Sequence, residues 1–372
     1  MLHRIPCAMM RGGTSKALVF LADDLPSDSA ERNAVLLRAM GSPDARQIDG
    51  AGGGDPLTSK VAIIGRPTDP SAADINYLFA QVSLDRPIVD TTPNCGNILA
   101  AVGPFAIEAG LVKPRGAETL VRVFNINTNS VVEVYVPTPH GEVTYEGETT
   151  IDGVPFPGSA IKIDFRDAVG SKTKMLLPTG LACEEIDGVP VSCVDMAMPM
   201  LLIPAEAVGK TGYESKAELD ADTALLARIE ALRQKASLRM GLGDATDRVV
   251  PKMALIASPQ HGSGVSSRYF MPFSCHAAHA VTGAVCIAAA AGIEGSIVHR
   301  LARISDSPRR IVRIEHPSGF LDVEMETEGT GPSTVIRRAA VLRTARRLFD
   351  GHVLVPSSSL PAAARLAAET AA

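Results

Sequence analysis

Two stretches of this sequence are apolar on every side, and both predict buried helices. The first follows Cys95 and ends near Glu108, and the second begins at about Ala277 and ends near Gly292. A helix that is apolar all round must be surrounded by protein or lipid. Both stretches are shorter than the ~20 residues that a bilayer-spanning helix needs. We therefore expect each half of the chain to wrap a sheet around one central helix.

Most of the remaining sequence predicts strands, and only two other segments predict helices. One helix is expected from Asp28 or Ser29 to Met40, and an amphipathic one at 215–239. Strands are expected at 2–10, 16–22, 61–64, 75–84, 119–127, 130–136, 143–146, 159–166, 189–195, 200–203, 252–257, 265–270, 309–315, 319–325, 334–344 and 351–356. Strands with little βαβ alternation predict an α+β fold with mostly antiparallel sheets, not a doubly wound parallel sheet.

The domain boundaries are predicted from a hinge and from the two apolar helices. The hinge is expected at 172–181, where Pro178 and Gly180 interrupt the pattern. This places an N-terminal domain at 1–180 and a C-terminal domain at 181–356. An Ala-rich tail, expected to be a surface helix or frayed, occupies 357–372. The two apolar helices also hint at an internal duplication.

Composition argues against several classes of function. The formal net charge is −5, no long basic run occurs, and aromatic residues make up only 4% of the chain. These features disfavour nucleic-acid binding. The six cysteines form no C-x-x-C pair, which disfavours a zinc ribbon or a thioredoxin motif. The N-terminal residues lack the apolar core of a signal peptide, so we expect a soluble cytoplasmic protein with reduced thiols.

Cys95 is a candidate functional residue because it stands at the start of the first apolar helix. The first turn of a helix presents unpaired N–H groups and a partial positive charge, which suit an anion. A reactive thiol at that end would face the ligand. The alternative is a buried structural cysteine at a helix cap.

Lys60 is a second candidate, placed between a glycine-rich loop and an apolar strand. The loop is GAGGGDPLTS at 50–59, and the strand begins with Val61. A partly desolvated lysine has a lowered pKa and can act as a base. The alternative is a solvated loop lysine. A P-loop is excluded, because Ser precedes Lys16 and Lys60 where glycine is required.

His276 and His279 are three residues apart and could bind a metal on one face of a helix, with Cys275 as a third ligand. No acidic residue lies close by in the sequence, and caps or core histidines are the alternative. Cys95 with a histidine could also form a hydrolase dyad, but nothing resembles a nucleophile elbow.

Taken together, these motifs resemble the PrpF family. The resemblance rests on MRGGTSK at 10–16, TSK at 58–60, NCGN at 94–97, LPTG at 177–180, HPSG at 316–319 and TARRLFDG at 344–351. It implies the diaminopimelate-epimerase-like fold, with two similar domains, each a sheet wrapped round a central helix. It also implies an active site in the cleft between the two domains.

The resemblance implies a cofactor-independent isomerase of small unsaturated di- and tricarboxylates. Members of the family include 2-methylaconitate isomerases, 3-methylitaconate Δ-isomerases and 4-oxalomesaconate tautomerases or Δ-isomerases. The sequences at 53–63 and 97–108 resemble the oxalomesaconate branch most closely. The 2-methylaconitate and 3-methylitaconate activities remain as alternatives, and a noncatalytic carboxylate-binding protein is an alternative of another class.

The resemblance also assigns residues. It implies Lys60 as the proton-transfer residue and Cys95 as its partner. Diaminopimelate epimerases use two cysteines, one at the start of each central helix. This chain departs from that pattern, since Cys275 precedes its second helix and Cys286 lies well inside it. Lys60 is therefore the better candidate.

The expected ligand is a small anionic di- or tricarboxylate, with no metal and no cofactor. The residues expected to hold it are Arg11, Gly12, Gly13, Thr14, Ser15, Ser59, Asn94, Gly96, Asn97, Arg268, His279, Ser318 and Gly319. Binding to nucleic acid or to a membrane is not expected, and a homodimer is left open.

Overall fold

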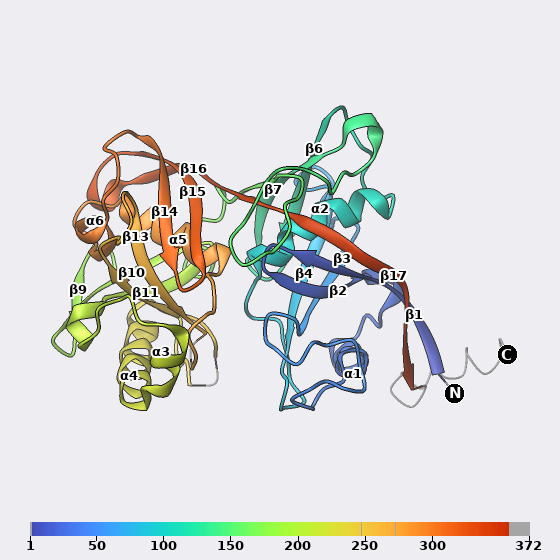
Figure 1. Ribbon diagram of the computed structural model, residues 1–372, viewed down its shortest axis with the longest axis horizontal. Helices are drawn as coiled ribbons and strands as arrows, with labels where there is room; N and C mark the ends of the chain where they lie inside the picture. The colour runs from blue at the N-terminus through green and yellow to red at the C-terminus, as the bar shows by residue number, and fades with distance from the viewer. Residues whose placement is uncertain (1, 247, 272, 357–372) are drawn as a thin grey trace.

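The computed structural model describes residues 2–246, 248–271 and 273–356. Two lobes stand side by side in Figure 1, each with strands around a helix. The blue-to-green lobe contains α1 and α2, and the yellow-to-orange lobe contains α3 to α6. The α+β prediction, with one buried helix in each half, is confirmed.

The first lobe is built from these elements: β1 (Leu2–Gly12), β2 (Ser15–Leu21), η1 (Ala22–Asp24), α1 (Ser29–Met40), β3 (Lys60–Gly65), β4 (Ile75–Val82), β5 (Val89–Asp90), α2 (Gly96–Glu108), β6 (Glu118–Asn125), β7 (Ser130–Pro137), η2 (Pro139–Gly141) and β8 (Ile161–Asp164). Asp28 caps α1 by accepting from two backbone N–H groups, as the sequence predicted.

The second lobe follows with β9 (Glu184–Ile186), β10 (Val189–Met196), β11 (Met198–Pro204), η3 (Ala205–Val208), α3 (Lys216–Ala221), α4 (Thr223–Arg239), β12 (Lys252–Ala257), β13 (Val265–Phe270), α5 (Val281–Ala291), α6 (Ile297–Leu301), β14 (Arg309–His316), β15 (Gly319–Glu328), η4 (Gly331–Ser333), β16 (Val335–Arg343) and β17 (Ala345–Pro356).

The two lobes repeat one order of strand pairing. In the first lobe β1 pairs antiparallel with β2, β3 runs parallel to β2, and β4 runs antiparallel to β3. In the second lobe β10, β11, β12 and β13 pair in the same way. β6 then runs parallel to β4, as β14 runs parallel to β13. The strand pairing therefore shows the internal duplication that the two apolar helices suggested.

The central helices are buried by the strands around them. Residues 96–107 of α2 and every residue of α5 are buried. The helices meet at their N-terminal ends, where a Cβ added to Gly96 would lie 2.8 Å from Val281 Cβ. The first residue of each helix therefore lies at the junction of the two lobes.

The last described strand, β17, joins the lobes. It leaves β16 and crosses to the first lobe, where it pairs antiparallel with the whole of β1 (Figure 1). The domain ranges 1–180 and 181–356 stay a prediction, and 345–356 lies on the first lobe. The Ala-rich tail predicted at 357–372 is outside the described residues.

One predicted strand is absent and three predicted elements have other bounds, among them the final piece at 351–356, which is the end of β17. The strand at 143–146 is a loop, because Thr144 N bonds to Pro137 O while Tyr145 O accepts from Ser159 N, so no continuous ladder forms. The helix at 215–239 is divided at Asp222, which has a nonhelical ψ of 81° and caps α4. The second apolar helix begins at Val281 instead of Ala277, since Ala280 has an extended backbone.

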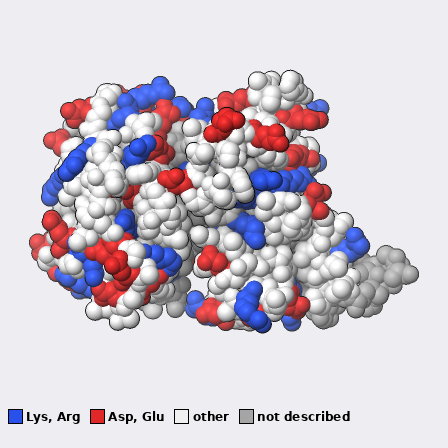
Figure 2. All heavy atoms as spheres, viewed as in Figure 1, with Lys and Arg blue, Asp and Glu red and all other residues white. Residues whose placement is uncertain are grey.

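On the face shown in Figure 2, basic and acidic side chains are interspersed over both lobes. Within the described ranges, no helix has both the length and the apolar character needed to cross a membrane.

Candidate active site

A cavity of about 910 Å³ is lined by residues of both lobes. Six residues that the sequence predicted lie in its lining: Ser15, Lys60, Asn94, Cys95, Gly96 and Asn97. The second lobe contributes Met198, Lys252, Tyr269, His276, Ala280, Val281 and Thr282. The cavity thus lies where the two central helices begin.

Lys60 is the first residue of β3, and its side chain is held in place by β4. It is only 6% exposed, and its Nζ donates to Gln81 Oε1 at 2.6 Å. Gln81 lies directly opposite Lys60 in the ladder. The Gln81 Nε2 donates to Ser59 O and Pro56 O at 2.8 and 3.1 Å, which leaves its oxygen facing the lysine.

Burial makes Lys60 easier to deprotonate than an exposed lysine. Burial lowers the pKa of Lys60, and electrostatic interaction with Cys95 and Asp55 opposes that shift. The Lys60 Nζ lies 5.3 Å from the centre of the Phe79 ring. Desolvation disfavours an ammonium ion, so more of this lysine is available as a base near neutral pH than an exposed lysine would be.

Cys95 is the N-cap residue of α2, as predicted, and its thiol forms no disulfide. Its carbonyl accepts from Leu99 N at 3.0 Å and from Tyr77 Oη at 3.4 Å, which fixes the start of the helix. The next N–H groups point along the helix axis toward the cavity, where they can bind a negatively charged group.

The turn between β1 and β2 packs against the start of α2. Arg11 donates to Gly13 O at 2.9 Å and to Thr344 O at 3.0 Å, within the protein. Gly12 packs directly on the backbone of Asn97, where a Cβ would overlap the Asn97 oxygen. The hydroxyl of Thr14 accepts from Asn97 Nδ2 at 3.2 Å. Gly12, Gly13 and Thr14 contact Asn97 in the first turn of α2, whereas Arg11 ties the turn to Thr344, and none of the four lines the cavity.

Ser59 is buried beside Lys60 and is not among the residues that line the cavity. Its hydroxyl donates to Val82 O at 2.8 Å and accepts from Gln47 Nε2 at 2.6 Å. The structure therefore gives Ser59 contacts that fix the loop before β3.

Four predicted residues of the second lobe are outside the cavity lining. The guanidinium of Arg268 donates to Glu214 O at 2.6 Å, and His279 Nε2 lies 3.0 Å from Ser267 Oγ. Ser318 donates to Ala277 O, and Gly319 lies against Asp152. Their contact with a ligand stays a prediction.

His276 lines the cavity, although the sequence singled it out only as a metal ligand. Burial, with a further contribution from Lys60, lowers the pKa of His276 to about 3. Its Nδ1 accepts from Ala278 N at 2.9 Å. In the part of the chain that the structure describes, no group of three His, Cys, Asp or Glu side chains is arranged to hold a metal ion.

Sequence reasoning missed Lys252, the first residue of β12. It lines the cavity and is 7% exposed. In the second lobe it occupies the position that Lys60 occupies in the first lobe. Burial lowers the pKa of Lys252 to about 7, Asp90 opposes the shift, and Lys60 adds to it. The available signal was the likeness of KMALIA at 252–257 to KVAIIG at 60–65.

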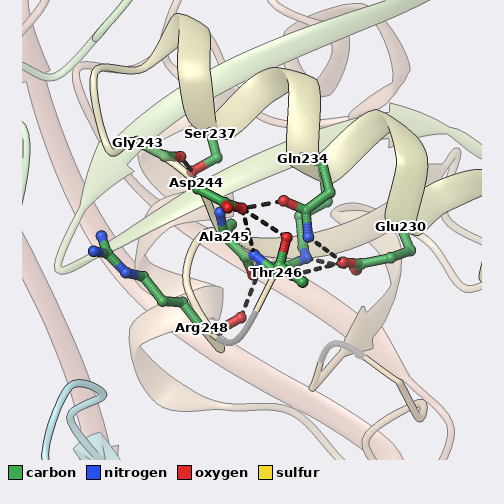
Figure 3. Close-up of polar contacts among 9 residues, drawn as sticks. Glu230, Gln234, Ser237, Gly243, Asp244, Ala245, Thr246 and Arg248 are labelled. Carbon is green, nitrogen blue, oxygen red and sulfur yellow. Dashed lines mark hydrogen bonds and ion pairs between the residues drawn. The ribbon is translucent and has the colours of Figure 1, made fainter.

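The loop before β12 is held by side chains of α4 (Figure 3). The buried Arg233 donates to Arg248 O at 3.0 Å and to Ala245 O at 2.8 Å, and it pairs with Glu230. Ser237 donates to Gly243 O at 2.7 Å. These bonds hold the segment in which Arg248 lines the cavity.

The model of the family described as PrpF protein matches residues 2–356. The chain belongs to the PrpF family. Two of the relatives that match almost the whole chain are the following. The 4-oxalomesaconate tautomerase of Pseudomonas putida KT2440 is 51% identical over 352 residues, which are 95% of this chain and 96% of that protein. The (4E)-oxalomesaconate Delta-isomerase of Novosphingobium sp. KA1 is 49% identical over 350 residues, 94% of this chain and 97% of that protein.

Solved structures agree with this PrpF assignment. A methylitaconate-delta-isomerase superposes with a TM-score of 0.80 at 36% identity, covering 97% of each chain. A hydroxyproline epimerase from Agrobacterium vitis has a TM-score of 0.57 at 11% identity, covering 94% of this chain and 92% of that one. The second likeness shows the fold alone. The predicted epimerase-like fold with two similar domains is confirmed.

Proposed function

We propose that this PrpF-family chain is a cofactor-independent isomerase of small unsaturated tricarboxylates. The observation that carries the proposal is the Lys60 amine, which is buried, lowered in pKa and held at the cavity beside Cys95 and the start of α2. A neutral amine next to an anion-binding helix end suits removal of a proton from a carbon conjugated to a carboxylate.

The proposed reaction moves a proton across an allylic or keto–enol system. Lys60 removes a proton from carbon, and the electron pair of that C–H bond enters a dienolate. Charge then develops on carboxylate or keto oxygens, where the N–H groups at the starts of α2 and α5 can stabilise it. A proton returned to a different carbon completes the shift of the double bond.

The substrate that we favour is 4-oxalomesaconate, because two relatives near 50% identity carry names based on it. Tautomerisation and double-bond migration use the same removal and return of a proton. The alternatives are 3-methylitaconate, supported by the name of a solved structure at 36% identity, and 2-methylaconitate. We place the reaction in the cytoplasm, and the six free cysteines support a reducing compartment.

A noncatalytic carboxylate-binding protein is the candidate from another class. It requires an anion-binding cavity but no base. The burial of Lys60 opposes this candidate, since an exposed lysine would bind a carboxylate without the cost of desolvating an ammonium ion.

The test is steady-state isomerisation of 4-oxalomesaconate by Lys60→Met and Lys60→Arg, with folding checked by circular dichroism. We expect kcat to fall by about 10²–10⁴-fold in both, because neither replacement can take up a proton near neutral pH. Lys16→Met is the matched control, since Lys16 also follows a serine in a glycine-containing turn but lies outside the cavity lining. Full activity in Lys60→Met would remove Lys60 from the mechanism.

A further inference from the structure

The repeated strand pairing gives several cavity-lining residues of one lobe a structural counterpart in the other. Lys60 lies beside Ala17 in the parallel β2–β3 ladder, and Lys252 lies beside Met200 in the parallel β11–β12 ladder. Both lysines are the first residues of their strands. Lys252 is therefore the structural counterpart of Lys60.

Five further pairs of cavity-lining residues follow the same correspondence. Phe79 faces Ala62, two residues after Lys60, and Tyr269 faces Ala254, two residues after Lys252. The remaining counterparts are Ser15 with Met198, Cys95 with Ala280, Gly96 with Val281, and Asn97 with Thr282. All of these residues line the one cavity. The ligand space is thus enclosed by two related half-sites.

The comparison of half-sites separates the two candidate proton carriers. The N-cap of α2 is Cys95, but the N-cap of α5 is Ala280, so the second half-site has no thiol there. The lysine is present in both half-sites. A proton shift that needs one group in each lobe can therefore use two lysines but cannot use two cysteines.

Lys252 has the surroundings that an acid–base group needs. It is nearly fully buried at the cavity, and its Nζ forms no hydrogen bond or ion pair within residues 2–246, 248–271 and 273–356, whereas Lys60 Nζ is bound to Gln81. Two ammonium groups sharing one cavity repel each other. One lysine therefore loses its proton more readily while the other remains charged, which supplies one base and one acid.

We propose that Lys252 is a catalytic residue that carries out the second proton transfer of the isomerisation. This inference rests on the proposed function. One lysine amine takes a proton from the substrate carbon, and the pair of electrons of that C–H bond forms the dienolate. The other lysine, as an ammonium, protonates the far carbon of the allylic system and becomes an amine. Solvent then carries the proton from the first lysine back to the second, and the roles exchange in the reverse reaction.

The experiment follows isomerisation and carbon-bound deuterium by NMR in D₂O for Lys252→Arg, Lys252→Met and Lys60→Arg. The probes are 4-oxalomesaconate, 3-methylitaconate and 2-methylaconitate. We expect isomerisation to fall by about 10²–10⁴-fold in all three variants. The Lys252 variants should still exchange hydrogen at the carbon that is deprotonated in the substrate. Lys60→Arg, supplied with the isomerised product, should exchange hydrogen at the other carbon of the allylic system. Lys235→Met, which removes a surface lysine of the same lobe, is the control.

Several results would overturn the role of Lys252. If Lys252→Arg keeps the kcat of the wild type, the lysine supplies only charge. Loss of exchange at both carbons in either variant would also contradict two independent proton carriers. The wild type gives a test that needs no variant. If the substrate's own hydrogen appears at the product carbon, one base carries out both transfers, and the role of Lys252 is contradicted. A wild type inert on all three acids would overturn the proposed function, and the role of Lys252 with it.

Discussion

At the scale of single residues, the position of the Lys60 amine depends on Gln81. The Gln81 oxygen accepts from Lys60 Nζ at 2.6 Å, and a charged donor makes the stronger bond. Gln81→Met should lower kcat about tenfold through loss of positioning. It should also move the rising limb of the pH–kcat profile to lower pH, because the ammonium form loses a partner. An unchanged profile would mean that Gln81 does not control Lys60.

Cys95 should matter less than either lysine if the two half-sites work as a pair of amines. We expect Cys95→Ala to lower kcat by less than about tenfold, compared with about 10²–10⁴-fold for Lys60→Met. The comparison is made at saturating substrate on proteins with matching circular dichroism. A loss as large as that of Lys60→Met would make the thiol a proton carrier instead.

The burial of Lys252 predicts a pH dependence of stability. Its folded pKa of about 7 lies below its ordinary value of 10.5, so between these pH values the unfolded chain binds more protons than the folded one. Stability that depends on Lys252 therefore rises with pH across that window. Urea unfolding of the wild type minus that of Lys252→Met should show this rise, and a flat difference would contradict the burial of the amine.

The local sequence indicates Lys60 but not Lys252, which can be found only through the likeness of 252–257 to 60–65. Lys60 follows a glycine-rich loop, which marks a close approach of backbone to ligand. Lys252 follows the segment 241–251, and the surroundings that bury it come from both lobes. Such long-range burial leaves no local pattern in the sequence.

At the scale of elements, the contact between the starts of α2 and α5 can be tested with two glycines of one helix. An added Cβ would lie 2.8 Å from Val281 at Gly96 and 2.8 Å from Val136 at Gly103. Gly96→Ala and Gly103→Ala should each lower the unfolding free energy by about 1–3 kcal/mol through overpacking. Only Gly96→Ala should also raise KM, because it alone separates the lobes. Equal KM values in both variants would show that this contact does not shape the site.

Most strands and both central helices could be predicted because their patterns are local. Runs such as 252–257 and 265–270 match the observed strands in full. The prediction of a strand at 143–146 was wrong because its strand-like pattern meets no continuous partner. The prediction of one unbroken helix at 215–239 was wrong because capping by Asp222 overrides the helical periodicity. These errors arise where tertiary partners or a single side chain decide the backbone.

At the scale of the whole molecule, two lobes with one topology enclose one cavity. The motif resemblance predicted the cleft between them and the fold. It did not predict which expected residues stay outside the lining, such as Arg268, Ser318 and Gly319. Their side chains or backbone are engaged with Glu214, Ala277 and Asp152, and such pairings depend on the folded arrangement.

The most direct test of the central claim is proton NMR of 4-oxalomesaconate in D₂O with the wild-type protein. If the chain moves a proton through a solvent-exchanging amine, deuterium will enter the substrate or product carbon as the double bond shifts. The same measurement with 2-methylaconitate and 3-methylitaconate would identify the branch of the family. Folded protein that places no deuterium in any of the three acids would contradict the proton-transfer mechanism.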